Sequence, residues 1–152
     1  MGTAWHLIKR LATSLPRTPP SDDDEAWVSS RLLPGEQRLW NRLSNPDRRH
    51  AILVARRFVD RLAPVAPGRA AVAAALLHDV GKLRSDLGTW ARVAATLIGP
   101  RGSRFRDYHD HEAIGVEMLT NAGSDPLTLA LVGRLGGAPA TLIDALTSAD
   151  DI

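Results

Sequence analysis

The feature that most constrains the fold is an apolar run over residues 69–78, which ends in a histidine and is followed at once by an aspartate. The run reads RAAVAAALLH, and its small and aliphatic residues occupy every face of a helix rather than one stripe. A helix that is apolar all round is stable only inside a core. The sequence therefore predicts a buried helix over 69–78, with His78 and Asp79 at its end.

The rest of the chain also predicts helices, because apolar residues recur at three- and four-residue spacing and helix-start residues precede many of these stretches. We expect the start signals to be the aspartates at 22–24, Pro34, Asn45 with Pro46, Ser124 with Pro126, and Pro139. The expected helices cover 4–15, 22–33, 34–43, 46–62, 69–78, 86–98, 110–122, 125–134 and 140–150. No stretch alternates apolar and polar residues over a useful length, so the predicted fold class is all-α.

A proline-containing segment near the start, residues 16–21 (PRTPPS), divides the chain. We expect an N-terminal helix and linker over 1–21 and a single helical domain over 22–152. A chain of 152 residues is long enough to bury the core of one domain. The amphipathic helix expected at 4–15 would pack on the core or make a homo-oligomer contact.

Composition excludes several classes of protein. The chain has no cysteine, which excludes a disulfide scaffold, a zinc ribbon and a thiol nucleophile. No stretch reaches the roughly 18 apolar residues of a membrane span, and Lys9 and Arg10 interrupt what would otherwise resemble a secretory signal. The net charge of +2 gives no strong sign of a nucleic-acid partner, and we expect a cytoplasmic protein.

Two histidine–aspartate pairs occur, and their surroundings distinguish them. A carboxylate at Asp79 would end a buried helix, where desolvation and the helix dipole both disfavour negative charge. A bound cation would offset both costs. The second pair, His109 and Asp110, follows a polar basic loop over 99–107 and needs no such compensation.

Two further residues extend the first pair into a candidate metal site. His50 lies beside the apolar face of the helix PDRRHAILVARRF, and Asp150 ends the helix TLIDALTSADD. Two imidazoles and two carboxylates suit a borderline or hard divalent ion, such as Mn, Fe, Co, Ni or Mg. The predicted metal ligands are His50, His78, Asp79 and Asp150.

The order of these residues resembles the HD-domain metal-dependent phosphohydrolase superfamily. Its pattern is a histidine on one helix, a His-Asp pair ending a later apolar helix, and a distant aspartate. The matching strings are RRHAILVA, AALLHDVGK and ALTSADD, within residues 46–151. The resemblance implies an HD-type helical bundle and hydrolysis of a nucleotide or another small phosphate ester.

Part of that family binds two metals and has two more histidines before the final aspartate. The string HEAIGVEML, which begins at His111, resembles the first of these sites. The second would fall near 134–137, where this chain reads RLGG. The departure argues against a full dinuclear centre, and leaves His111 as a neighbour of the ligands, a proton donor or half of a second site.

We hypothesise that the metal activates water against a phosphate ester. Asp79, as a ligand, and Lys82, as a point charge that holds a phosphate, are the expected catalytic residues. Arg49, or its neighbour Arg48, would add positive charge for the phosphate.

Each assignment has a structural alternative. His78 and Asp79 could cap a helix end, His50 could be a partly buried histidine bonded to backbone, and Asp150 could be a solvated acid with Asp151 as an adjacent rival. Lys82 could simply complement a helix C-terminus.

The competing function is a non-catalytic HD scaffold that senses a nucleotide or binds a protein. The sequence GRLGG around residue 134, without histidine, favours that alternative. The retention of all four predicted ligands argues against it, because a binding module has no need of them.

Overall fold

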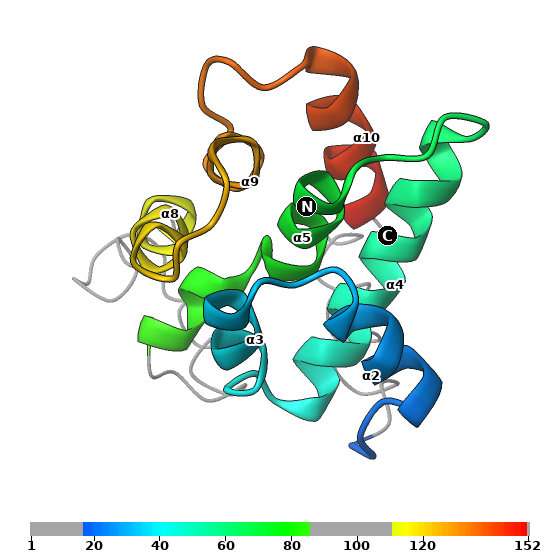
Figure 1. The fold of residues 1–152 in the computed structure, drawn as a ribbon, viewed down its shortest axis with the longest axis vertical. Coiled ribbons are helices and arrows are strands. Elements are labelled where there is room, and N and C mark those ends of the chain that lie inside the picture. The colour runs from blue at the N-terminus through cyan, green and yellow to red at the C-terminus, as the bar shows by residue number, and fades with distance from the viewer. Residues whose placement is uncertain (1–16, 86–110, 152) are drawn as a thin grey trace, which may run out of the picture.

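The computed structural model describes residues 17–85 and 111–151, which fold into a bundle of helices without any strand (Figure 1). The elements are α2 (Asp22–Ser29), α3 (Pro34–Trp40), α4 (Asn45–Leu62), α5 (Arg69–Leu77), the 3-10 helix η1 (Val80–Ser85), α8 (His111–Asn121), α9 (Pro126–Val132) and α10 (Ala140–Asp150). The all-α prediction is confirmed. The helices expected at 4–15 and 86–98, the loop at 99–107, His109 and Asp110 lie outside the described residues.

Helix α5 forms the centre of the bundle, in contact with α4 and α9, and α10 packs against α4 near the C-terminal end of α5 (Figure 1). Every residue from Ala71 to Leu77 is at most 1% exposed, as the apolar sequence predicts. Each fully buried valine or leucine there contributes roughly 1.5–3 kcal/mol. This burial fixes the C-terminal end of α5 and so places His78 and Asp79, both partly buried, at the edge of the core.

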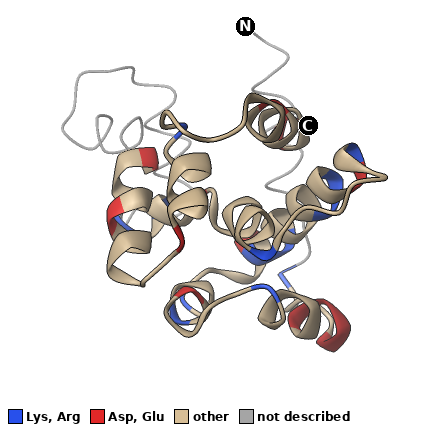
Figure 2. Cartoon of the chain, turned by 45° about the horizontal axis from the view of Figure 1, so that its top comes forward, with Lys and Arg blue, Asp and Glu red and all other residues tan. Residues whose placement is uncertain are grey.

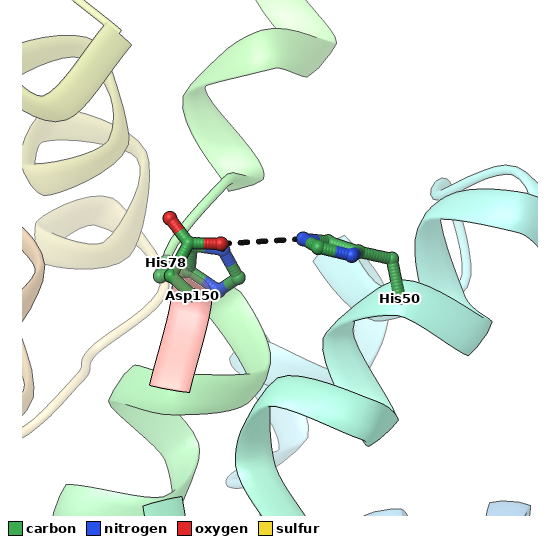
Figure 3. Close-up of side chains that lie close together, drawn as sticks. All are labelled: His50, His78 and Asp150. Atoms are coloured by element: carbon green, nitrogen blue, oxygen red, sulfur yellow. Dashed lines mark hydrogen bonds and ion pairs between the residues drawn. The ribbon is translucent and has the colours of Figure 1, made fainter. Parts of the chain in front are cut away.

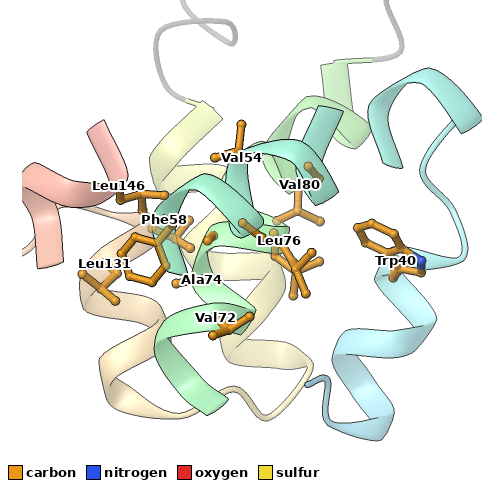
Figure 4. Close-up of a cluster of buried hydrophobic side chains, with 14 of the residues drawn as sticks. Trp40, Val54, Phe58, Val72, Ala74, Leu76, Val80, Leu131 and Leu146 are labelled. Carbon is orange, nitrogen blue, oxygen red and sulfur yellow. The ribbon is translucent and has the colours of Figure 1, made fainter. Parts of the chain in front are cut away.

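The core around α5 is built from aliphatic side chains and two large aromatic ones (Figure 4). Phe58 from α4 and Trp40 from α3 are both fully buried. The indole Nε1 of Trp40 donates to Glu25 Oε2 at 2.8 Å, so its polar atom is satisfied. The core thus joins α3, α4 and α5 into one frame.

Several helix limits differ from the sequence-based expectations. The cap of α4 is Ser44 rather than Asn45: Ser44 Oγ accepts from Asp47 N–H at 3.3 Å and donates to the Asp47 carboxylate at 2.6 Å. The cap of α9 is Asp125 rather than Ser124. Helix α2 ends at Ser29 instead of running to Leu33, because Leu33 precedes a proline and is extended.

A close backbone crossing sets the position of α8. A Cβ added at Gly81 would lie 1.9 Å from the carbonyl oxygen of His111 and 2.9 Å from the amide nitrogen of Gly115. Only glycine therefore allows η1 to approach α8 so closely. The crossing brings the start of α8, with His111, beside the Asp79 end of α5.

Charged residues of both signs are interspersed along the described helices, and the longest acidic stretch is the first turn of α2 (Figure 2). Ser21 caps that turn by accepting from Asp24 N–H at 3.2 Å. Among the described residues, no helix combines the length and apolar character needed to cross a membrane.

Candidate metal centre

Three predicted ligands from three helices converge at one point (Figure 3). His50 comes from the first half of α4, His78 from the C-cap of α5 and Asp150 from the last residue of α10. One donor atom from each lies within 4.8 Å of the others. The packing of α4 against α5 and α10 thus brings together side chains that are up to 100 positions apart in the sequence.

The ring of His78 is oriented by the backbone of its own helix. Its Nδ1 lies 2.8 Å from the carbonyl oxygen of Ala75 and donates to it, which turns Nε2 towards the cluster. Nε2 is buried and has no hydrogen-bond partner among the described residues, although Asp150 Oδ1 is 3.3 Å away and Asp79 Oδ2 is 3.5 Å away. A histidine that ligates a metal is usually held this way, with its second nitrogen bonded to a carbonyl.

His50 and Asp150 complete the group. His50 Nε2 lies 3.3 Å from Asp150 Oδ1, and the same oxygen faces His78 Nε2 at 3.3 Å. The two imidazole rings are tilted, with their centroids 5.8 Å apart. Both ring nitrogens therefore point to one carboxylate oxygen, an arrangement with room for a shared ligand between them.

The electrostatics of the cluster favour a positive charge at its centre. The hydrogen bond from His50 and the nearby imidazole of His78 lower the pKa of Asp150 below its ordinary range. Burial opposes protonation of His78, but the carboxylates of Asp79 and Asp150 outweigh it and raise its pKa to about 9. Burial likewise opposes ionisation of Asp79, but His78 and Lys82 lower its pKa to about 2. Without a metal, a proton on His78 supplies the charge that these carboxylates attract.

Asp79, the fourth predicted ligand, lies beside the three-residue group and makes contacts on both sides. Its Oδ2 accepts from Lys82 Nζ at 2.5 Å and faces His78 Nε2 at 3.5 Å. Its Oδ1 is 3.9 Å from His111 Nε2. The structure therefore puts Lys82 and His111 beside Asp79.

Asp150 and Asp151 were the two candidates for the last metal ligand, and the structure distinguishes them. Asp150 faces both histidines, whereas Asp151 is the exposed C-cap of α10. His6 and His109 lie outside the described residues.

The two arginines expected to bind phosphate make structural contacts instead. Arg49 donates to the carbonyl oxygens of Thr18 and Pro19 and to Thr18 Oγ1, at 2.7–2.9 Å. Arg48 donates to the carbonyl oxygens of Leu43 and Asn41. These bonds hold the linker and the turn before α4, so they give no support to the predicted phosphate-binding role.

Two hollows open beside the cluster, and Asp79 lines both. The first, which we name the Lys82 hollow, is mainly aliphatic and includes Asp47, His50 and Lys82. The second, the Arg134 hollow, includes His78, Asp150, His111, Glu112 and Arg134. The sequence analysis missed Asp47, Glu112 and Arg134. At position 134 the sequence pattern indicates only that an expected histidine is absent. No sequence pattern points to Asp47 or Glu112.

The residues present fit a divalent cation. The buried Nε2 of His78 lacks a hydrogen-bond partner among the described residues, and the donor set of two imidazoles and nearby carboxylates suits a borderline or hard ion. Comparison of the chain with family models, curated proteins and solved structures found no match. The chemistry of the site is therefore inferred from its own residues and geometry.

Proposed function

We propose that this chain is an HD-type metal-dependent phosphohydrolase that acts on a nucleotide or another small phosphate ester. The observation that carries the proposal is the convergence of His50, His78 and Asp150, whose donor atoms lie within 4.8 Å of one another. The order of these residues resembles that of the HD superfamily, and the helical bundle is compatible with it.

The proposed ligands are the converging three and Asp79, whose carboxylate borders the same histidine. When bound, a divalent ion supplies a Lewis acid that activates water and polarises a phosphate oxygen. The chain contributes orientation, because the Ala75 carbonyl fixes the His78 ring and leaves its Nε2 for the ion. Four protein ligands leave coordination positions for water and substrate.

Lys82 is the residue that we propose to attract the substrate phosphate from the Lys82 hollow. Its ammonium group lies 2.5 Å from Asp79 Oδ2 and lines that hollow. A lysine acts on a phosphate as a point charge. A metal ion held by Asp79 would compete with Lys82 for that carboxylate, which would leave the Lys82 ammonium group more available to a substrate phosphate.

One observation favours the alternative, a non-catalytic HD scaffold that senses a nucleotide or binds a protein. The Lys82–Asp79 ion pair and the bond between His50 and Asp150 hold the cluster together through protein groups alone. Such a cluster could persist in a module that uses the fold only to bind.

Hydrolysis assays with matched variants separate the two functions. We expect the Mn²⁺-soaked protein to release phosphate or nucleotide from a panel of phosphomonoesters, phosphodiesters and nucleoside polyphosphates. Asp150→Asn should abolish release, whereas Asp151→Asn, one position further on and exposed, should leave it unchanged. A protein that binds manganese but cleaves no member of the panel would support the scaffold instead.

A further inference from the structure

Arg134 has a backbone conformation that arginine rarely adopts. Its φ is +50°, and it is the one non-glycine residue with positive φ among those that the structure describes. It follows the C-cap of α9, where Leu135 N–H donates to the Ala130 carbonyl at 2.9 Å and Arg134 N–H approaches the Leu131 carbonyl at 3.4 Å. These two bonds form the Schellman motif, which ordinarily has glycine at the position of Arg134.

An arginine at this position carries a conformational cost that a glycine would avoid. Glycine takes a left-handed conformation without strain, and Gly137 does so three residues later with a φ of +102°. Strained backbone conformations cluster at functional sites, so a strained residue beside the candidate metal centre is a reason to look for a function of its side chain.

The side chain of Arg134 lines the Arg134 hollow together with the proposed ligands His78, Asp79 and Asp150. Its Nε lies 3.3 Å from Glu112 Oε1, in an ion pair between two partly exposed side chains. The bond uses Nε, so the two terminal nitrogens have no acceptor among the described residues. Their donors remain available to a ligand in the hollow.

The charge of the hollow explains why a ligand anion would need this arginine. Asp79, Glu112 and Asp150 all line it, and among the described lining residues Arg134 is the only lysine or arginine. A phosphate entering from this side meets three carboxylates. A bound metal ion offsets part of that repulsion, and a guanidinium, which stays protonated at any physiological pH, offsets more.

We propose that Arg134 is a substrate-binding residue, whose terminal guanidinium nitrogens hold oxygens of the substrate phosphoryl group beside the metal ligands. The inference rests on the proposed function, because it takes the substrate to be a phosphate ester. Glu112 acts as a positioning residue that keeps the guanidinium over the hollow. The planar, forked guanidinium suits two phosphate oxygens at once.

The strained backbone provides a variant that should weaken phosphate binding without lowering the stability of the protein. Arg134→Gly should leave the thermal midpoint unchanged or raise it, since glycine takes the required φ freely. The same variant should bind inorganic phosphate about tenfold more weakly or worse in titration calorimetry on the Mn²⁺-loaded protein. Arg61→Ala is the matched control, because Arg61 is an exposed arginine of α4 that lines neither hollow.

Three results decide the proposal. Weaker phosphate binding in Arg134→Gly, with Arg61→Ala equal to wild type, supports it. Equal phosphate affinity in Arg134→Gly and wild type overturns it, as does a wild-type protein that binds no phosphate with or without Mn²⁺.

Manganese titration of the same proteins tests the proposed metal site independently of the proposed role of Arg134. Arg134→Gly should bind Mn²⁺ like wild type, and Asp150→Asn should not bind it. If Asp150→Asn binds Mn²⁺ normally, or wild type binds none, the metal site is wrong. The role of Arg134 is then decided by phosphate titration in chelator, where a loss confined to Arg134→Gly supports it and no loss contradicts it.

Discussion

Two regions of the molecule hold carboxylates against nitrogen-bearing side chains, and the two regions use different side chains to do so. In the first, Glu36 of α3 is fully buried and its Oε2 accepts from Arg69 at 3.2 Å and from Leu33 N–H at 2.8 Å. Arg69 also binds Asp125 and the carbonyl oxygen of Arg31. This Arg69 network joins α3, α5 and the start of α9 through a permanently charged guanidinium.

In the second region, the candidate metal centre, the carboxylates of Asp79 and Asp150 face imidazoles. An imidazole can give up its proton at moderate pH, whereas a guanidinium cannot. We therefore propose that a metal ion can take the place of the proton on His78 beside these carboxylates, whereas the Arg69 network keeps its own permanent cation. We therefore expect the Arg69 network to stabilise the fold, and we propose that the candidate metal centre binds a cation.

The largest expected change in the free energy of unfolding comes from disrupting the Arg69 network. Arg69→Met should lower the free energy of unfolding by about 3 kcal/mol, because it leaves the Glu36 charge buried without its cation. Urea denaturation of the metal-free protein measures the effect. Adding Glu36→Gln should recover part of the loss. If the single variant is as stable as wild type, the network has no structural role.

The next largest effect is the gain in the free energy of unfolding on adding Mn²⁺, which should depend on the residues of the candidate metal centre and not on the Arg69 network. Mn²⁺ at a hundred times its dissociation constant should stabilise wild type by about 2.7 kcal/mol. The same gain is expected in Arg69→Met and none in His78→Ala, while circular dichroism shows that both variants remain helical. A manganese-dependent gain in His78→Ala would place the ion elsewhere.

A smaller effect is expected at a surface ion pair that belongs to neither region. Arg56 donates to Asp24 at 2.8 Å and lies over the Trp27 ring, 4.4 Å from its centroid. Because both charges are partly exposed, Arg56→Ala should cost only about 0.5 kcal/mol at neutral pH. Metal binding should not change, and a loss of it would mean that α2 influences the centre.

The same pair gives a pH dependence of known sign. The hydrogen bond from Arg56 lowers the pKa of Asp24 from its ordinary value of 3.8. A lowered folded-state pKa contributes stability that is present above 3.8 and is lost as pH falls through the folded value. The stability difference between Arg56→Ala and wild type should therefore narrow in acid below pH 3.8, and a difference that widens there would contradict the assignment.

The sequence predicted the centre of the fold well, because α5 is apolar on every face and can be stable only when buried. The same argument singled out His78 and Asp79, since a polar pair that ends such a helix needs compensation. His50 and Asp150 followed from their order along the chain. Their meeting depends on how α4, α5 and α10 pack, which no local pattern shows.

Other features depend on tertiary contacts that the sequence does not announce. Arg49 was expected near the phosphate, and in the structure its Nε and one terminal nitrogen donate to the backbone of Thr18 and Pro19. The left-handed backbone of Arg134 results from the turn after α9, whereas the sequence nearby would suggest that a glycine takes this role.

The most direct test of the metal centre is metal content per chain, measured on protein purified without chelator or histidine tag and then soaked with Mn²⁺. The account predicts about one ion per chain in wild type and Asp151→Asn, and none in Asp150→Asn, because one of the converging donors is lost. Equal metal content in Asp150→Asn and wild type, or no metal in any of the three proteins, would contradict it.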